Sequence, residues 1–151
     1  MATKSSGFSL VELLVVVAIL GVLSAVGIVT YGGYVKGSKQ NAAESIMQQI
    51  ALAETEEYSS AGSYYVQSGC SVDGDITLET LGGLTSEIET NLFFGEKIID
   101  ESLGYQMCVV ETGSTFSVVA FNGTCKIILS AQGAWNRGPM SGGVDTVCPR
   151  E

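Results

Sequence analysis

The chain has 151 residues, enough for one domain with a hydrophobic core and too few for two ordinary domains. Charged residues make up 15% and hydrophobic residues 46% of it, which excludes an intrinsically disordered chain. A formal net charge of -9 disfavours nucleic acid as a partner, because non-specific binding to phosphates needs a basic surface. The sequence has no histidine, so His-based triads and His-ligated zinc are excluded, and no motif indicates an enzyme, a metal site or a cofactor.

An apolar segment lies near the start of the chain. No residue from Leu13 to Val35 is charged, and as a helix this segment is long enough to cross the ~30 Å hydrocarbon core of a bilayer. A secretory signal peptide is the competing interpretation, because Lys4 supplies a basic start. It fits less well, since the apolar segment is longer than a signal core and no A-x-A-like cleavage site follows it. Residues 8–35 are therefore predicted to form a hydrophobic transmembrane helix.

Glu12 interrupts the beginning of this apolar sequence, between Val11 and Leu13. A carboxylate in a membrane segment is costly unless it is paired or neutralised, so such a residue is a candidate functional site. The alternative is that Glu12 only marks the interfacial edge of the membrane.

The residues around Glu12 form a recognisable pattern. Residues 7–12 read GFSLVE and lead into the apolar run, which resembles the amino-terminal signature of type IV pilins. In that family a short hydrophilic leader ends in Gly, the mature chain usually begins with Phe, and Glu is its fifth residue. The resemblance implies a leader peptide of residues 1–7, cleavage between Gly7 and Phe8 by a prepilin peptidase, and N-methylation of Phe8.

The resemblance also implies how such a subunit assembles. The apolar helix would hold the single-pass precursor in the inner membrane and later form the core of a filament at the cell surface. Glu12 would pair with the Phe8 amine of a neighbouring subunit, because apolar surroundings penalise an unpaired charge. We therefore expect Phe8 and Glu12 to be assembly residues. The implied partners are further copies, other pilins, the prepilin peptidase and a pilus assembly platform.

The helical period continues beyond the apolar segment. Between residues 36 and 58 apolar side chains recur every three or four residues, with polar ones mainly on the other side. The stripe comprises Ala43, Ile46, Met47, Ile50, then Ala53 or Glu54, and Glu57 or Tyr58. We predict one long helix whose apolar half continues into this amphipathic half and ends in the turn formers of residues 59–63.

A connecting loop is predicted over residues 59–104, where turns alternate with short apolar pieces. Within it, the capping-box-like pair Ser86 and Glu89 indicates a short helix that runs to about Phe94. Three strands rich in Val, Ile, Phe and Thr follow within residues 105–130, separated by short turns. Their predicted bounds are Tyr105 to Glu111, Thr115 to Asn122 and Lys126 to Ser130.

The four cysteines indicate two disulfides and an oxidising compartment, because there is no C-x-x-C pair and no histidine for a metal site. Four cysteines permit three pairings. In pilins a late disulfide often encloses an exposed loop. The resemblance thus implies a bridge from Cys125 to Cys148 that closes the C-terminal loop of residues 131–151, which leaves Cys70 for Cys108.

Two weaker signals have simple interpretations. Residues 73–75, Asp-Gly-Asp, match only part of a calcium loop, so we predict a turn and no metal site. Phe93, Phe94 and Trp135 are interpreted as packing aromatics, with anchoring of a partner as the alternative.

These observations predict an α+β, type IV pilin-like fold, with a long N-terminal helix packed on a small antiparallel sheet in a periplasmic or extracellular head, residues 36–151. The leading hypothesis is a structural subunit of a type IV pilus, a homo-oligomeric helical filament used for adhesion, motility or DNA uptake. A pseudopilin of a type II secretion system is one alternative, since it shares the amino-terminal signature. A single-span, membrane-anchored binding module that does not polymerise is the other.

Overall fold

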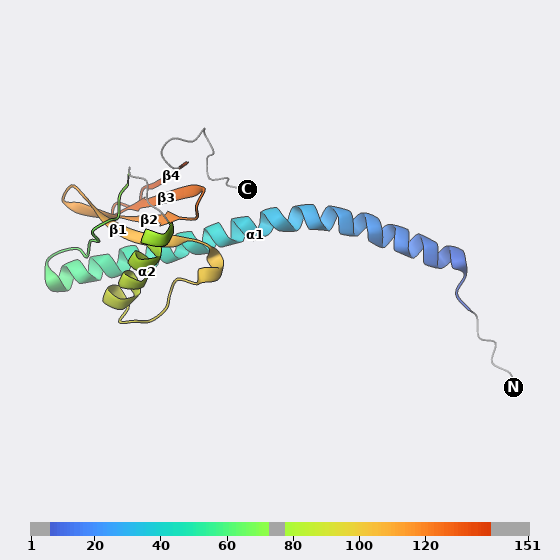
Figure 1. Cartoon of the computed structure of the whole chain (residues 1–151), viewed down its shortest axis with the longest axis horizontal. Coiled ribbons are helices and arrows are strands. Elements are labelled where there is room, and N and C mark those ends of the chain that lie inside the picture. The colour runs from blue at the N-terminus through green and yellow to red at the C-terminus, as the bar shows by residue number, and fades with distance from the viewer. Residues whose placement is uncertain (1–6, 73–77, 140–151) are drawn as a thin grey trace. The chain divides into compact units, whose positions relative to one another are not determined.

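The computed structural model describes residues 7–72 and 78–139 (Figure 1). The chain divides between Lys36 and Gly37 into two compact units, an apolar N-terminal unit and a head. The elements follow in the order α1 (Leu10–Ala61), α2 (Leu78–Leu92), a 3₁₀ turn (Glu101–Leu103), β1 (Gln106–Thr112), β2 (Thr115–Phe121), β3 (Cys125–Ser130) and β4 (Trp135–Pro139). The predicted α+β architecture of a long N-terminal helix and an antiparallel sheet is confirmed.

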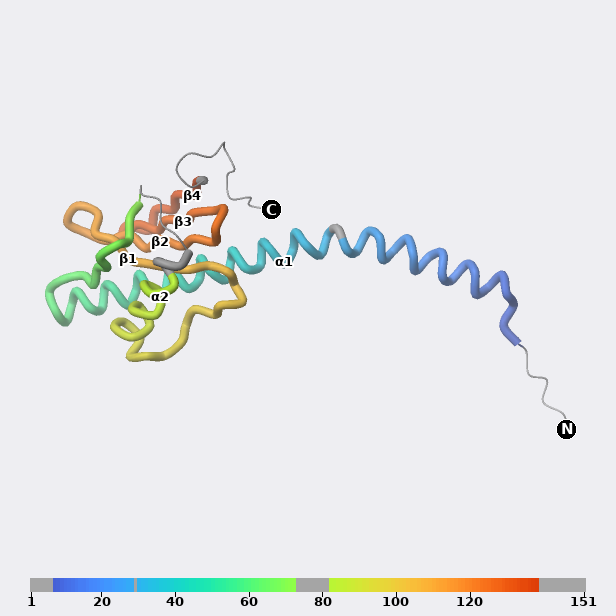
Figure 2. The backbone as a smooth tube through the Cα atoms, viewed as in Figure 1, coloured from blue at the N-terminus to red at the C-terminus, as the bar shows by residue number. Residues whose placement is uncertain are grey.

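Helix α1 is a single element of 52 residues, and its backbone continues without a break through Gly27, Gly32 and Gly33 (Figure 2). It ends slightly beyond the predicted Tyr58, where Gly62 adopts a φ of +77° and its N–H donates to the Tyr58 carbonyl at 2.9 Å. Glycine takes this left-handed conformation without steric cost, so it is the common residue just past a helix.

The sheet is an antiparallel meander with the strand order β1-β2-β3-β4, so each strand pairs with its neighbour in sequence. Successive side chains of a strand point to opposite faces, and here both faces are covered. One face packs against the amphipathic stripe of α1, where Ala43, Met47 and Ile50 are fully buried. The predicted stripe is therefore confirmed from Ala43 to Glu54, while Tyr58 at its predicted end is exposed. On the other face, Cys108, Val119 and Phe121 of the sheet form a second cluster with Cys70 and with Leu84 of α2.

Strand β4 was missed by the sequence analysis, which assigned residues 131–151 to a loop. Gly138 and Pro139 disfavour a strand interior. However, β4 is an edge strand and Pro139 is its last residue, and proline is tolerated in edge strands. Helix α2 is longer than predicted and begins at Leu78, before Ser86. Gly82 and Gly83, which precede the predicted start of this helix, lie inside it, because burial of Leu84 and Ile88 outweighs the weak helix propensity of the two glycines.

An ion pair fixes β4 to α1. The Nε and one terminal nitrogen of Arg137 donate to the Glu44 Oε1 at 3.0 and 2.9 Å, and both side chains are mostly buried. Gln40 donates to the same oxygen at 3.2 Å, while the Arg137 guanidinium lies 5.4 Å from the centre of the Trp135 ring. The edge strand is thus held to the helix by charge-assisted hydrogen bonds as well as by sheet pairing.

Candidate functional site

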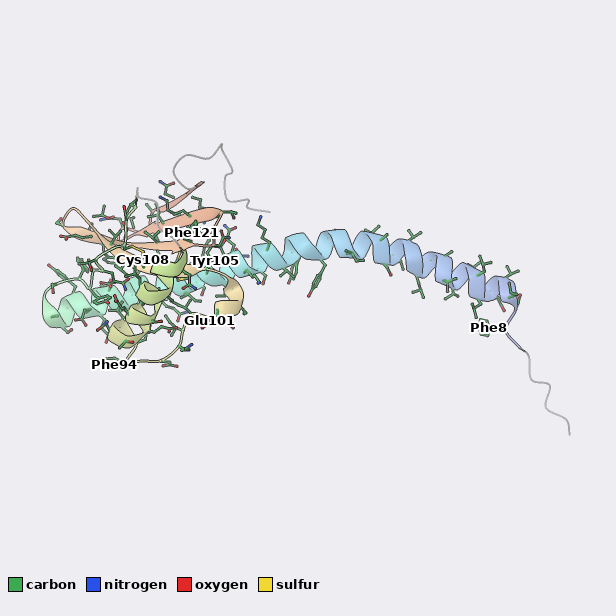
Figure 3. All side chains as sticks on the ribbon, in the orientation of Figure 1. Phe8, Phe94, Glu101, Tyr105, Cys108 and Phe121 are labelled. Carbon is green, nitrogen blue, oxygen red and sulfur yellow. A yellow bond between two sulfur atoms is a disulfide. The ribbon has the colours of Figure 1, made fainter. Side chains whose placement is uncertain are left out.

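The predicted cleavage site lies outside the helix. Gly7, Phe8 and Ser9 precede α1 in non-helical backbone, and the Phe8 side chain is 81% exposed (Figure 3). A peptidase requires its substrate backbone in an accessible, locally unstructured form. The Gly7–Phe8 bond meets that requirement.

Glu12 lies in the first turn of α1 and caps it. Its Oε2 accepts a hydrogen bond from the Ser9 backbone N–H at 3.0 Å. A Glu at the third helical position that reaches back to the N–H of the residue before the helix is one half of a capping box. This capping role of Glu12 was not predicted from the sequence, although the spacing Ser9-x-x-Glu12 is its sequence signal. The bond uses one carboxylate oxygen and holds the carboxylate beside Phe8.

The N-terminal unit presents an apolar surface on all sides. Its side chains are exposed around the whole helix; among them are Leu10, Val11, Leu13, Leu14, Ile19, Leu20, Leu23 and Val26, each more than half exposed. The hydroxyls of Ser24 and Thr30 donate within the helix, to the Leu20 carbonyl at 2.7 Å and to the Val26 carbonyl at 2.9 Å. Glu12 is the only charged side chain from residue 8 to residue 35. A helix that is apolar all round needs lipid or other helices around it.

Length and composition agree with a membrane span, since the most apolar window of α1 has a mean hydropathy of 2.8. Residues 2–28 match the family described as the prokaryotic N-terminal methylation motif. The chain carries a prepilin-type N-terminus. No curated protein sequence and no solved structure is significantly similar to it.

The motif implies that this pilin-like chain is a substrate of prepilin peptidase, and it is the N-terminal signature of the type IV pilin and pseudopilin superfamily. Together with the apolar helix, it indicates a membrane-anchored precursor. Proteins of this superfamily are structural. In the described ranges, no group of three or more Cys, Asp or Glu side chains could hold a metal ion, while residues 73–75 lie outside those ranges.

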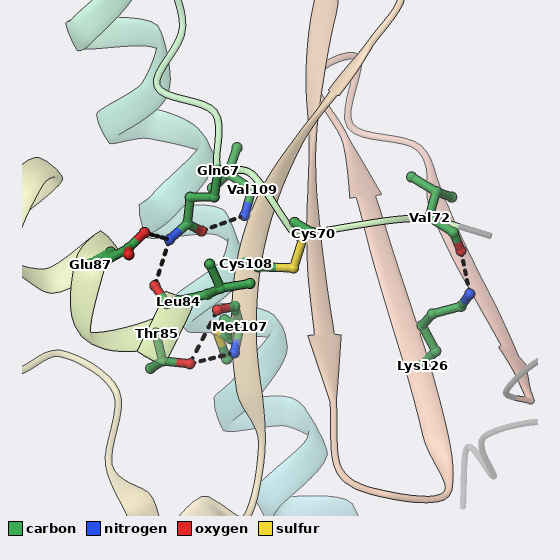
Figure 4. The surroundings of a disulfide bond; sticks show 10 residues. All are labelled: Gln67, Cys70, Val72, Leu84, Thr85, Glu87, Met107, Cys108, Val109 and Lys126. Atoms are coloured by element: carbon green, nitrogen blue, oxygen red, sulfur yellow. Dashed lines mark hydrogen bonds between the residues drawn. A yellow bond between two sulfur atoms is a disulfide. The ribbon is translucent and has the colours of Figure 1, made fainter. Parts of the chain in front are cut away.

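A disulfide ties the segment after α1 to the sheet of the pilin-like head. Cys70 and Cys108 are joined with an S–S distance of 2.03 Å, and Cys108, on β1, is fully buried (Figure 4). Cys125 is also in a disulfide. The proposed partner of Cys125 is Cys148, which lies outside the described residues.

Polar side chains cover the outer edge of β1. Gln67 makes two hydrogen bonds with the backbone of Val109. The Gln67 backbone N–H donates to the Val109 carbonyl, and the Gln67 side-chain Oε1 accepts from the Val109 N–H, both at 3.0 Å. The Thr85 hydroxyl accepts from the Met107 N–H at 2.9 Å and donates to the Met107 carbonyl at 3.1 Å (Figure 4). Uncovered strand edges attract other strands, so this cover prevents unspecific pairing of heads through β1.

Glu54 is a buried carboxyl in the amphipathic half of α1. It is fully buried; its Oε2 accepts from the Tyr65 N–H at 2.9 Å, and its Oε1 has no hydrogen-bond partner among the described residues. Burial raises the pKa of Glu54 from 4.5 to about 7, against the lowering effect of the Tyr65 N–H and with a further rise from the nearby Glu57.

We expect the raised pKa of Glu54 to make the head less stable as the pH rises from 4.5 to 7. In this interval the unfolded carboxyl has lost its proton while the folded one retains it, so folding binds a proton. The free energy of unfolding should fall by about 3 kcal/mol and then level off above pH 7. Chemical denaturation of the full chain in detergent at several pH values measures this.

Glu54→Gln should remove that pH dependence, because the amide does not titrate. Glu56→Gln, an exposed change on the same helix turn, should keep it. Parallel profiles for the wild type and Glu54→Gln would contradict the assignment.

Proposed function

We propose that this chain is a structural subunit of a type IV pilus. The precursor is cleaved between Gly7 and Phe8, the new amine of Phe8 is methylated, and the mature subunit polymerises through its N-terminal helix. The filament then stands on the cell surface, where its role is adhesion, motility or DNA uptake.

One observation carries the proposal. A helix surface that is apolar on all sides bears a single carboxylate, Glu12, in its first turn, next to the residue that becomes the N-terminus. Lipid satisfies the apolar surface before assembly and neighbouring helices satisfy it afterwards. In either environment a lone carboxylate is costly, and the Phe8 amine of a neighbouring subunit is the complementary charge that offsets this cost.

The test is the intact mass of the protein in filaments sheared from the cell surface, with and without reduction. We expect a dominant species that begins at Phe8, is heavier by one methyl group and gains about four hydrogens when two disulfides are reduced.

Other results would identify the alternatives. Cleaved protein that stays in the membrane and is absent from the sheared fraction would favour a pseudopilin of a type II secretion system. Uncleaved protein in the membrane, with residues 1–7 retained, would overturn the proposal and favour a membrane-anchored module that does not polymerise.

A further inference from the structure

Phe94 has an unusual position on the head. Its side chain is 96% exposed, although the sequence analysis predicted a packing aromatic, and it points away from the core (Figure 3). Its φ is +54°, and within residues 7–72 and 78–139 it is the only residue other than glycine with a positive φ. For an aromatic side chain this backbone conformation is strained. The neighbouring Phe93, by contrast, is partly buried against the core.

The surrounding loop imposes this conformation. After α2 ends, the Gly95 N–H donates to the Glu89 carbonyl at 2.8 Å. The Glu89 carboxylate is buried and accepts hydrogen bonds from the N–H groups of Ile98 and Ile99 at 3.1 and 3.0 Å. The loop is therefore pinned on both sides of Phe94, and glycine or asparagine would fit position 94 with less strain. In the single chain, the Phe94 side chain is therefore exposed and its backbone conformation is strained.

A groove elsewhere on the head has the character to receive an aromatic ring. It has a volume of about 390 Å³ and lies between α1 and the β3–β4 hairpin, lined by Gln48, Ala51, Leu52, Thr55, Leu129 and Trp135 among others. Leu52 is 71% exposed in it. None of the lining residues within the described ranges is charged, whereas two other pockets on the head contain Glu111 or the group Lys97, Asp100 and Glu101.

Charge favours this groove for a contact between copies. Each chain carries a net charge of -9, so copies repel one another wherever acidic side chains meet. Phe94 is flanked by the uncharged Phe93 and Gly95 and would meet uncharged residues in the groove. Because the ring and the groove involve different residues, the contact is heterologous, and a heterologous contact can repeat along an open helical assembly.

We propose that Phe94 of one subunit inserts into the groove between α1 and the β3–β4 hairpin of a second subunit. This inference rests on the proposed function. The strained, exposed phenylalanine then gains in the filament the burial that it lacks in the single chain.

The first test separates assembly from folding. Phe94→Gly keeps the positive φ at no steric cost, so the melting temperature of the purified chain should equal or exceed that of the wild type. The yield of sheared filaments should fall at least about tenfold, as for loss of an aromatic anchor from an interface. Glu96→Gln, an exposed change in the same loop, should alter neither. Wild-type filament yield for Phe94→Gly would overturn the proposal.

The second test identifies the contact directly. Benzoylphenylalanine at position 94 places a photoreactive ring where the phenylalanine lies, and illumination should join two copies of the chain. Mass spectrometry should locate the adduct within residues 48–55 or 129–135 of the second copy. Adducts only at other places, only with other proteins, or none would overturn the proposal. If the wild type makes no filaments, only the proposed function is overturned. The same cross-linking experiment on membranes then tests whether Phe94 contacts the groove of a second copy.

Discussion

Replacement of Glu12 by alanine is expected to abolish filaments while the leader is still removed. Glu12 is the only charged side chain of the apolar helix segment, so it is the only group there that can neutralise the Phe8 amine of a neighbour. An unpaired charge in apolar surroundings costs on the order of 3 kcal/mol or more per subunit, which corresponds to more than a hundredfold loss of assembly. Filament yield after shearing and the mass of the membrane-bound protein measure the two effects.

The capping bond of Glu12 requires a second variant, because alanine removes both the charge and the hydrogen bond to the Ser9 N–H. Glu12→Gln keeps a side-chain oxygen for that bond and removes only the charge. If charge pairing determines subunit register, glutamine should fail to assemble as alanine does. Ser24→Ala, a neutral change in the same helix, should assemble normally. Normal filaments from Glu12→Gln would show that Glu12 acts through capping alone, and normal filaments from Glu12→Ala would exclude both roles.

Removal of the Cys70–Cys108 disulfide is expected to cost about 4 kcal/mol of unfolding free energy. The bond closes a loop with a sequence separation of 38, and a closed loop of this length restricts the unfolded chain by about that amount. The double variant Cys70→Ala with Cys108→Ala avoids a polar group at the buried position 108. Denaturant unfolding of the full chain in detergent gives the free energy directly.

A matched control for the disulfide variant is Ser68→Ala, an exposed change in the same segment, which should leave the unfolding free energy unchanged. The hydrogen bonds of Gln67 to Val109 remain in both variants, so the segment still has its contact with β1. A loss below about 1 kcal/mol in the double variant would mean that these bonds, and not the covalent link, fix the segment.

The features that depend on regular spacing could be predicted from the sequence. The period of the helix identified the buried stripe of Ala43, Met47 and Ile50, and runs rich in Val, Ile, Phe and Thr between short turns identified the first three strands near their observed bounds. Glu12 was identified because a single charge in an apolar run is conspicuous. These signals are local, so they can be read without knowing which residues meet in space.

The features that were missed depend on distant contacts. Strand β4 contains Gly138 and Pro139, and its docking depends on Arg137 meeting Glu44, a separation of 93 residues. The exposure of Phe94 follows from a loop that is fixed by Glu89. Because aromatic residues are ordinarily packed, the residue type alone predicted that Phe94 would be buried. The full burial of Glu54 has a similar origin, because the Tyr65 N–H that contacts it belongs to a segment beyond the end of the helix.

The order of the strands has a consequence for how the head folds. Every strand pairs with its neighbour in sequence, so the meander closes only short loops and its contacts are local. Docking of α1 on the sheet instead joins residues as far apart as Glu44 and Arg137. We therefore expect the hairpins to form before the helix docks, so the stripe of Ala43, Met47 and Ile50 should be the last apolar surface to be covered. At that stage we expect the uncovered helix face to be the surface through which unfinished copies aggregate.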